Sequence, residues 1–477
     1  MDRRDFLALG ASATATPLLA PAFAQAPDFG GRFVWGAATS SYQIEASPTR
    51  AGGGASVWDA FCRRPGAIRD GSSGEIACDH YERYREDVAL MGELGVRAYR
   101  FSIAWPRVIP EGVGTPNGRG YDFYDRLVDA LLAAGIEPWI TLFHWDYPEA
   151  LYRRGGWLNR DSAQWFADYA TAVVARLSDR VTRWITFNEP EVFIVLGHHL
   201  GVHAPGDKLP WGEILRLSHH VLLAHGHAAL AIRAAAKRPC EIGYVAALEP
   251  AIPASAQAAD VEAARRATFS GMAAWLLDPV YLGSYPEREL GAWAKDVPAF
   301  PAEDLRAICQ PLDFFGANIY QGNVVRAGAE GNPERVPRPP GAPRTLMDVF
   351  DVVPEALQWG PRFYWERYRL PVVVTENGLS NCDWLALDGH VHDPQRIDFM
   401  QRYLGQLALA RAGGVDVRGY FAWSLLDNFE WAEGYRQRFG LVHVDFATQR
   451  RTPKDSFGWY RDVIRTNGAS LGRRAVA

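Results

Sequence analysis

Two glutamates, Glu189 and Glu376, occupy similar surroundings in a chain of 477 residues. Glu189 ends the apolar run R-W-I-T-F-N-E (183–189) before a proline, and Glu376 follows P-V-V-V-T (371–375) and precedes an asparagine. Both runs have the β-branched and aromatic residues typical of buried strands. Two carboxyls facing each other across a pocket can cleave a glycosidic bond, one as the acid and one as the nucleophile or base. A single N-E-P tripeptide ordinarily marks only the point where a strand leaves the core and enters a loop. A catalytic role for the two glutamates therefore requires a fold that brings them together.

The chain alternates short apolar runs with longer stretches of helical periodicity. Helical stretches at 86–95 and 121–135 end in glycine, and similar stretches cover 211–236 and 394–413. Strands that alternate with helices pair in parallel, because parallel neighbours need a crossover connection. Eight such units predict one α/β domain, a closed (β/α)8 TIM barrel with extended βα loops over residues 27–477. The eight predicted strands are 33–39, 98–105, 137–145, 183–189, 241–248, 314–320, 371–377 and 419–427.

Polar and aromatic residues gather at the C-terminal ends of seven of the eight predicted strands. Packing alone explains any one of them, but packing has no reason to prefer that end, where barrel active sites lie. Strands four and seven lie on opposing sides of the mouth, so Glu189 and Glu376 can face each other. Long loops at 47–56 and 328–344 are expected to extend the same end. The residues are Gln43, Arg100, His144, Trp145, Asn188, Glu189, Asn318, Tyr320, Glu376, Asn377, Trp423, Glu430 and Trp431.

The N-terminus has the order of a cleavable export signal. D-R-R-D-F-L (2–7) resembles the bacterial twin-arginine signal, and an apolar stretch and the small-residue pattern A-F-A-Q-A (22–26) follow it. Serine, threonine and proline interrupt the apolar stretch, which disfavours a membrane anchor. We expect residues 1–26 to be removed, leaving a soluble periplasmic protein that begins near Gln25 or Pro27.

Composition narrows the remaining classes of function. The net charge is −5 with both signs mixed along the chain, which argues against partners such as nucleic acid or an anionic membrane. The 5 cysteines are few, odd in number and far apart, without C-x-x-C or zinc spacing. Neither a disulfide framework nor a cysteine metal site is expected, and no cofactor is predicted.

Several motifs together resemble one family. T-F-N-E-P (186–190) and V-T-E-N-G (374–378) are similar to the acid/base and nucleophile signatures of glycoside hydrolase family 1, the β-glucosidase family. The resemblance covers nearly the whole mature chain in the right order. The other matching segments are F-V-W-G-A-A-T-S-S-Y-Q-I-E (33–45), A-C-D-H-Y-E-R-Y (77–84), Y-R-F-S-I-A-W-P-R (99–107), H-W-D-Y-P (144–148), G-V-H-A-P-G (201–206), W-S-L-L-D-N-F-E-W-A-E-G-Y (423–435) and R-F-G-L-V-H-V-D (438–445).

The resemblance implies a retaining exo-β-glycosidase that removes terminal β-D-glucosyl residues through a covalent glycosyl-enzyme. Glu376 would be the nucleophile and Glu189 the acid/base, with carboxyls about 5–5.5 Å apart. Arg100 and Tyr320 would keep Glu376 ionised, and its charge would raise the pKa of Glu189. Pro190 should bias Glu189 towards an extended backbone.

The same resemblance assigns the sugar contacts, including the 2-hydroxyl to Asn188 and a stacking floor to Trp423. A carboxylate at Glu430 would repel a 6-phosphate, so unphosphorylated β-glycosides or oligosaccharides are the expected small-molecule partners. Specificity for β-galactosides or β-fucosides, or transglycosylation at the same site, stays open. The implied substrate-binding residues are Gln43, His144, Trp145, Asn188, Asn318, Tyr320, Trp423, Glu430, Trp431 and Phe439.

Four residues depart from the family pattern: Glu191, His198, Ile319 and Phe350. Tryptophan is common among relatives where Glu191 and Phe350 stand, tyrosine where His198 stands, and an aromatic residue where Ile319 stands. All except Ile319 are expected on the leaving-group side. These departures concern the preference for the aglycone rather than the reaction.

The sequence disfavours three other classes of protein. The histidines at 198–203 and 219–227 suggest a metalloenzyme, but no H-E-x-x-H is present and polar packing on a helix explains the second group better. A redox protein would need a G-x-G-x-x-G after a strand, a Walker loop or C-x-x-C-H, and none occurs. A sugar-binding module without activity is disfavoured because both glutamates, Arg100 and Tyr320 are present.

Overall fold

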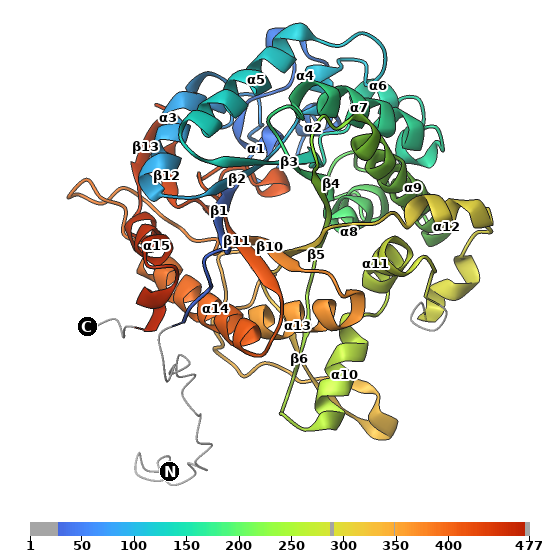
Figure 1. Cartoon of the computed structure of the whole chain (residues 1–477), viewed down its shortest axis with the longest axis vertical. Coiled ribbons are helices and arrows are strands. Elements are labelled where there is room, and N and C mark those ends of the chain that lie inside the picture. Colours follow the sequence, from blue (N-terminus) through green and yellow to red (C-terminus); the bar gives the residue numbers. More distant parts are fainter. Residues whose placement is uncertain (1–26, 287–290, 348, 473–477) are drawn as a thin grey trace, which may run out of the picture.

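A computed structural model describes residues 27–286, 291–347 and 349–472, and the predicted export signal at 1–26 lies outside them. Eight parallel strands form a closed barrel with helices around it (Figure 1). The predicted (β/α)8 barrel is therefore confirmed. The barrel strands are β1 (Val34–Ala38), β2 (Ala98–Ser102), β3 (Glu137–Phe143), β4 (Arg183–Asn188), β5 (Glu241–Ala247), β7 (Phe314–Asn318), β10 (Val372–Asn377) and β11 (Val417–Trp423).

Each predicted strand overlaps one observed strand, but several predicted C-terminal ends run too far, and the third and eighth strands show why. The run 137–145 stops as a strand at Phe143, so His144 and Trp145 lie in the following loop. The run 419–427 begins earlier, at Val417, and ends at Trp423. Both errors have one cause: the loop residues remain apolar because they are buried in the mouth of the barrel, which continues the strand-like composition.

Large rings fill the inside of the barrel. The Trp139 ring lies 5.3 Å from Phe314 and 5.1 Å from Phe421, centroid to centroid. Glycines stand where these rings need room: a Cβ on Gly36 would come within 2.3 Å of the Phe421 ring, and one on Gly243 within 2.2 Å of Phe314. The barrel is thus a packed core with its open end above the strand termini.

The helices follow the predicted pattern. The predicted stretch 86–95 lies in α3 (His80–Leu94), which ends at Gly95 with a left-handed φ of 79°. The stretches 121–135, 211–236 and 394–413 correspond to α5 (Gly118–Ala133), α9 (Trp211–Ala235) and α14 (Pro394–Ala412). The other helices are α1 (Ser41–Ile44), α2 (Val57–Cys62), α4 (Trp105–Val108), α6 (Glu149–Tyr152), α7 (Ser162–Leu177), α8 (Pro190–Val192), α10 (Ala258–Thr268), α11 (Met272–Leu282), α12 (Ala302–Ile308), α13 (Ala356–Tyr368) and α15 (Asp455–Arg465).

Two small sheets lie outside the barrel. β6 (Ala251–Pro253), β8 (Asn323–Ala327) and β9 (Pro333–Arg335) form one, near α10 at the lower edge of Figure 1. β9 lies within 328–344, which was predicted as loop only; its residues are polar and exposed, so no apolar alternation marks them. The second sheet pairs β12 (Val442–Asp445) with β13 (Arg450–Pro453).

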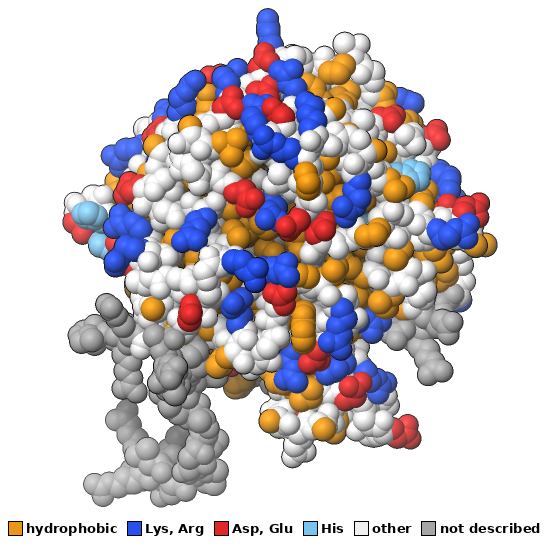
Figure 2. Space-filling view, in the orientation of Figure 1, with side chains coloured by type: hydrophobic (Ala, Val, Ile, Leu, Met, Phe, Trp, Pro, Cys, Tyr) orange, Lys and Arg blue, Asp and Glu red, His pale blue; other side chains and the backbone are white. Residues whose placement is uncertain are grey.

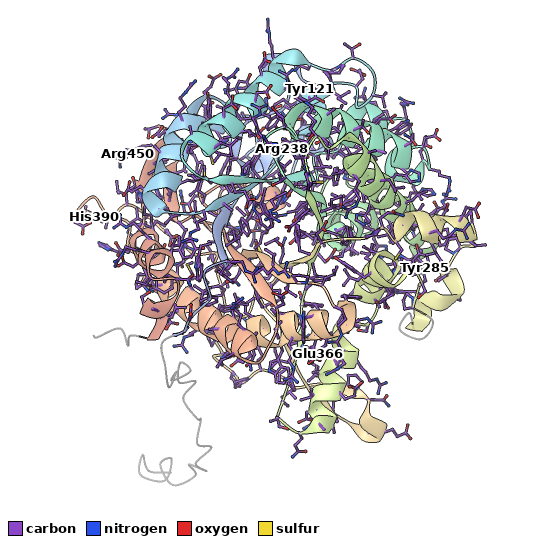
Figure 3. The ribbon with its side chains drawn as sticks, in the orientation of Figure 1. Tyr121, Arg238, Tyr285, Glu366, His390 and Arg450 are labelled. Carbon is purple, nitrogen blue, oxygen red and sulfur yellow. The ribbon has the colours of Figure 1, made fainter. Side chains whose placement is uncertain are left out.

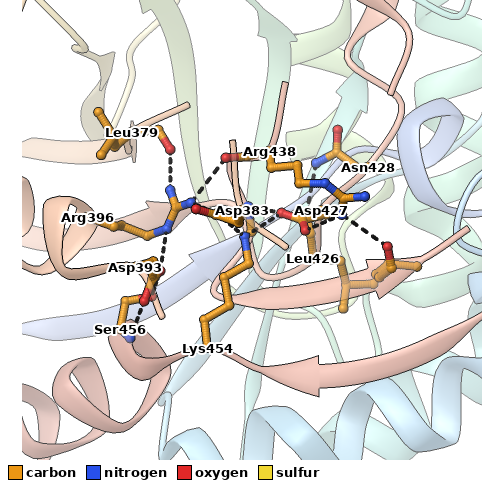
Figure 4. A network of polar contacts seen from close by, with 12 residues as sticks. Leu379, Asp383, Asp393, Arg396, Leu426, Asp427, Asn428, Arg438, Lys454 and Ser456 are labelled. Carbon is orange, nitrogen blue, oxygen red and sulfur yellow. Dashed lines mark hydrogen bonds and ion pairs between the residues drawn. The ribbon is translucent and has the colours of Figure 1, made fainter. Parts of the chain in front are cut away.

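A buried ionic network joins the loops after β10 and β11 to the C-terminal segment (Figure 4). Lys454 Nζ lies 2.5 Å from Asp383 Oδ2 and 2.7 Å from Asp427 Oδ1. Arg396 pairs with Asp383 and donates to the Leu379 carbonyl oxygen. The formal charges of the residues in the network sum to zero. The loops after β10 and β11 are each held by side chains that are distant in the sequence. The network consists of Asp383, Asp393, Arg396, Asp427, Arg438 and Lys454.

On the face seen in Figure 2, positive and negative side chains are interspersed, and no single sign dominates. Figure 3 places Tyr121 of α5 and Glu366 of α13 in the outer ring, around the strands. None of the helices in the described part of the chain combines the length and apolar character that a membrane span needs.

Candidate active site

The barrel brings Glu189 and Glu376 to its C-terminal end on either side of Asn318. Glu189 directly follows β4, Glu376 lies near the end of β10, and these strands are three positions apart in the barrel. Asn318, the last residue of β7, is in register with Glu376. Its Nδ2 donates a 2.8 Å hydrogen bond to Glu189 Oε1. The two carboxyls are therefore neighbours of one amide.

Glu189 does not have the extended backbone predicted from the following proline. Its φ of 48° and ψ of 63° are left-handed, so that prediction is wrong. The Glu189 N–H still donates to the Val245 carbonyl oxygen of β5 at 2.8 Å, and Pro190 immediately begins α8. The chain must turn from strand to helix within one residue, and this requirement overrides the usual preference before proline.

Left-handed backbone recurs at the site. Trp145 has a φ of 78° and Trp431 has a φ of 50°. Both are bulky residues that, like Glu189, adopt a backbone conformation that favours glycine. Such residues persist only where the surroundings hold them, and they cluster at functional sites. Here the two indole rings lie 4.6 Å apart, and Trp145 Nε1 donates to the Asn188 carbonyl oxygen at 3.0 Å.

Glu376 has two donors of its own. Arg100 Nη1 lies 2.5 Å from Oε1, and the Tyr320 hydroxyl donates to Oε2 at 2.7 Å. Burial raises the pKa of Glu376, and Arg100 and then Tyr320 oppose that rise by stabilising the charged carboxylate.

Within the described residues, no cationic side chain pairs directly with Glu189. Burial raises its pKa well above the ordinary value, and the charge of Glu376 raises it further. The Asn318 hydrogen bond and, after it, the charge of Arg100 lower this pKa. Because the guanidinium of Arg100 is paired with Glu376, Glu376 is the first of the two to ionise and Glu189 keeps its proton longer. The geometry therefore favours a charged carboxylate at Glu376 and a protonated carboxyl at Glu189.

Asn188 is fixed in orientation by three neighbours. Its Oδ1 accepts from Arg100 Nη2 at 2.6 Å and from Asn318 Nδ2 at 3.0 Å, so its Nδ2 faces His144 Nε2 at 3.1 Å. His144 Nε2 must then accept, which puts the ring proton on Nδ1. Burial, followed by the charge of Arg100, lowers the pKa of His144 well below its usual value. The imidazole is neutral, and its Nδ1 is buried without a partner among the described residues.

Thr375 is a functional residue that sequence reasoning missed. Its hydroxyl donates to Asn318 Oδ1 at 2.7 Å, which turns the amide nitrogen of Asn318 towards Glu189. The signal was present, because Thr375 immediately precedes Glu376 in V-T-E-N-G. Its role depends on which residue the neighbouring strand presents, and the sequence alone does not give that pairing.

Gln43 and Glu430 meet on the other side of the site. Gln43 lies on α1, and its Nε2 donates to Glu430 Oε2 at 3.2 Å and to Asn428 Oδ1 at 3.0 Å. Burial and then the charge of Glu376 raise the pKa of Glu430 to about 8. Near neutral pH the Glu430 carboxyl is therefore largely protonated and can both donate and accept hydrogen bonds, which reduces the expected charge repulsion.

Aromatic rings enclose these polar groups. His144 stacks at 5.9 Å on Trp423, the last residue of β11, and at 6.0 Å on Trp431. Tyr320 stacks on Phe350 at 5.1 Å with an interplanar angle of 6°, and Phe439 meets Tyr320 edge-on at 6.0 Å. All the sequence-predicted site residues are thus linked by direct contacts or lie on adjoining strand ends.

The positions that depart from the family pattern lie around this centre. Phe350 lies flat on Tyr320, while His198 Nδ1 pairs with Asp207 at 2.8 Å. Burial raises the pKa of Glu191 to about 8, and Glu191 Oε2 has no partner among the described residues. Ile319 is fully buried, and its N–H donates to the Glu376 carbonyl oxygen at 3.0 Å.

Several histidines of the two rich segments have ordinary protein partners. His219 Nε2 contacts Asp304 Oδ2 at 2.9 Å, and His225 Nδ1 contacts the Thr186 hydroxyl at 2.7 Å. His199 Nδ1 contacts the Leu209 carbonyl oxygen at 2.8 Å, and His203 packs near Trp58. Within the described ranges, no group of three or more His, Cys, Asp or Glu side chains is arranged to hold a metal ion.

A barrel mouth with two buried carboxyls of unequal proton affinity, walled by aromatic rings and amides, belongs to the class of sites that hydrolyse glycosides. Residues 25–469 match the family model for glycosyl hydrolase family 1. The chain is 43% identical over 437 residues to Beta-glucosidase A of Thermotoga maritima, with 91% of this chain and 97% of that protein covered. It is 44% identical over 454 residues to a Beta-glucosidase of Agrobacterium sp., with 94% and 97% covered.

A solved structure agrees with these relatives. The Beta-glucosidase from Thermotoga maritima in complex with glucoimidazole superposes with a TM-score of 0.85 at 43% identity, and 92% of this chain and 99% of that chain are covered. The chain therefore belongs to glycoside hydrolase family 1, as its motifs predicted.

Proposed function

We propose that this glycoside hydrolase is a retaining β-glucosidase that releases terminal β-D-glucosyl residues from unphosphorylated glycosides. The proposal rests on the different hydrogen-bond partners of two neighbouring carboxyls. Arg100 and Tyr320 stabilise charge on Glu376, while Glu189 shares only Asn318 with it. Such an arrangement provides a nucleophile and an acid in one site.

In the first step, a carboxylate oxygen of Glu376 bonds to the anomeric carbon. The bond to the glycosidic oxygen breaks, and Glu189 gives its proton to that oxygen, so the aglycone leaves as a neutral alcohol or phenol. In the second step, Glu189 takes a proton from water, and the water oxygen replaces Glu376 at the anomeric carbon. Two inversions leave the β configuration unchanged, and both carboxyls return to their starting states.

The bound sugar would be oriented by groups around the pair. Asn188, held by Arg100 and Asn318, is assigned to the 2-hydroxyl. Gln43 and Glu430, which contact each other, take the outer hydroxyls, and the Trp423 ring stacks on the apolar face of the sugar. Placing a 6-phosphate beside the buried Glu430 carboxyl is expected to cost free energy, and the cost rises as Glu430 ionises above about pH 8.

A panel of aryl β-D-glucosides, galactosides, fucosides and glucoside 6-phosphates tests this proposal. We expect the highest kcat/KM for the glucoside, and proton NMR should show β-glucose as the first product. Glu376→Gln should lose nearly all activity, while Glu213→Gln, in the first turn of α9 where the side chain pairs with Arg216, should behave as the wild type. A first product in the α configuration, or full activity of Glu376→Gln, would refute the mechanism. Higher activity on galactosides or fucosides, or net transfer to added alcohols, would favour the other specificities.

We also propose that residues 1–26 are an export signal of the twin-arginine type and that 27–477 form one catalytic domain. The support is the order of D-R-R-D-F-L, an apolar stretch and A-F-A-Q-A. Cell fractionation of a bacterial host should place the shortened protein in the periplasm. Replacing Arg3 and Arg4 with lysine should leave the unprocessed chain in the cytoplasm, and unchanged export of this variant would overturn the assignment.

A further inference from the structure

A cavity of about 570 Å³ lies outside the barrel, next to the active site. Its walls come from residues 343–346, Val352, the pair 354–355, the loop 379–381 after β10, and one face of α14. The loop 379–381 begins three residues after Glu376, so the cavity opens among the segments that follow the C-terminal ends of the strands. Its volume is within the range of small-molecule sites.

The chemistry of the walls is mixed and electrically balanced. Proline and aromatic surfaces come from Pro343, Pro354 and Phe399, while Gln395 and Gln406 add amides. Two guanidinium and two carboxylate side chains also line the cavity, so their formal charges cancel. Such walls suit an uncharged ligand that has both hydroxyls and an apolar face; an anion or a cation would find no net attraction. The four charged residues are Arg344, Arg402, Glu355 and Asp398.

One buried group lacks a partner that a hydroxyl would supply. Oε1 of Gln406 is buried and has no hydrogen-bond partner among the residues that the structure describes. Leaving an amide oxygen buried and unpaired is energetically unfavourable. Gln406 lies on the same face of α14 as Gln395 and Phe399, all three of which line the cavity. A donor on a ligand in the cavity would satisfy that oxygen.

We propose that this cavity is a second carbohydrate-binding site, which takes an uncharged sugar or glycoside with Gln406 Oε1 accepting from one of its hydroxyls. The ring face of the sugar, or an aryl aglycone, packs on the proline and Phe399 surfaces. Occupancy does not require the glycosidic bond to be cleaved, so the site is independent of the proposed hydrolysis.

The cavity shares a wall with the active site. The Ser380 hydroxyl accepts a 2.9 Å hydrogen bond from Met347 N, and the Ser380 carbonyl oxygen accepts one of 3.1 Å from Leu346 N. Leu346 faces the cavity, whereas Phe350 of the same segment lies flat on Tyr320. The second ligand would therefore contact the same segment that packs on Tyr320, the residue beside Glu376.

Titration calorimetry on the full-length protein can isolate this site. The active site is first filled with glucoimidazole until hydrolysis of an aryl β-glucoside stops. The probe is phenyl 1-thio-β-D-glucoside, which resists hydrolysis. We expect one equivalent of probe to bind saturably to the filled enzyme. Glucose as a second probe shows whether a free sugar suffices, and glucose 6-phosphate should bind no more tightly than glucose.

Three variants connect binding to the cavity. Gln406→Leu should weaken the probe about tenfold by removing the acceptor, and Gln395→Trp on the exposed rim should abolish binding by filling the space. Gln401→Leu is the matched control on α14, because its side chain contacts the Leu471 carbonyl oxygen instead. All three should keep kcat/KM for the aryl glucoside within about twofold. No saturable event in the filled wild type, or binding unchanged in both Gln406→Leu and Gln395→Trp, would overturn the proposal, whatever the hydrolysis assay shows.

Discussion

Nδ2 of Asn318 donates a 2.8 Å hydrogen bond to Oε1 of Glu189. This bond stabilises the charged form of Glu189 and so opposes the burial that raises its pKa. The amide thus limits how strongly Glu189 holds its proton. This limit suits the proposed acid/base role, because an acid/base must both give up and recover a proton in each catalytic cycle.

Asn318→Ala should move the alkaline limb of the kcat/KM profile to higher pH. The hydrogen bond lowers the pKa of Glu189, so its loss raises that pKa and keeps the acid protonated further into the alkaline range. The pH dependence with an aryl glucoside measures this shift. Asn323→Ala, whose side chain contacts Glu249 outside the site, is the control. An alkaline limb that stays in place or moves down would contradict the assigned role.

Tyr320→Phe should lower kcat by about 10–100-fold, because a hydrogen bond to a charged group contributes about 1.5–3 kcal/mol. Its hydroxyl lowers the pKa of Glu376, so the acid limb should also move to higher pH. Tyr364→Phe is a matched control, since the buried Tyr364 hydroxyl has no partner in the described part of the chain. Equal kinetics in the two variants would exclude a role for the Tyr320 hydroxyl.

Glu189→Gln should separate substrates by leaving group. Without an acid, poor leaving groups should lose far more kcat/KM than dinitrophenolate, which departs without a proton. The second step also lacks its base, so azide should accelerate it and yield the β-glucosyl azide. A series of aryl glucosides of graded leaving-group pKa measures the dependence. A uniform loss across the series, without azide rescue, would argue against the acid/base role.

Glu430→Gln should reduce kcat/KM for the β-glucoside by about 10–100-fold, which corresponds to about 1–3 kcal/mol for a misfitted hydroxyl contact. The comparison variant is Glu433→Gln, three residues further along the chain, where the side chain pairs with the exposed Arg69. Steady-state kinetics with an aryl β-glucoside and an aryl β-galactoside distinguish the effects of the two substitutions. A loss in Glu433→Gln as large as in Glu430→Gln would point to a loop effect instead.

Lys454→Met should destabilise the fold by about 3–5 kcal/mol, because it removes the cation that the buried carboxylates of Asp383 and Asp427 share. Each carboxylate then keeps only one arginine partner, Arg396 for Asp383 and Arg438 for Asp427. Urea unfolding followed by tryptophan fluorescence measures the change. Lys208→Met, at an exposed lysine, should stay near wild type. If both variants unfold at the same urea concentration, the ionic network does not contribute to stability.

The sequence was most informative where local composition determines structure. The apolar runs predicted all eight barrel strands, and the polar residues at their ends predicted which side chains meet, such as Arg100 with Glu376. It was least informative where the outcome depends on a distant partner. The left-handed backbone of Glu189 follows from a turn between β4 and α8, and the role of Thr375 follows from the register of β10 with β7.

The small sheet that contains β9 and the ionic network show the same limit. Lys454 reads as an ordinary lysine before a helix, and only the folded chain brings it to Asp383 and Asp427. The short strand β9 has no apolar alternation, because both of its faces are exposed.

The ionic network of Lys454 also constrains the order in which the enzyme can be completed. A ribosome makes the loops after β10 and β11 well before Lys454, since synthesis runs from the N-terminus. Until β13 and the start of α15 arrive, Asp383 and Asp427 lack the cation that joins their loops. A polypeptide cut short before this lysine would contain both glutamates of the proposed catalytic pair and lack the ionic contacts that hold the loops near them. Completion of the site therefore depends on residues that are made near the end of synthesis.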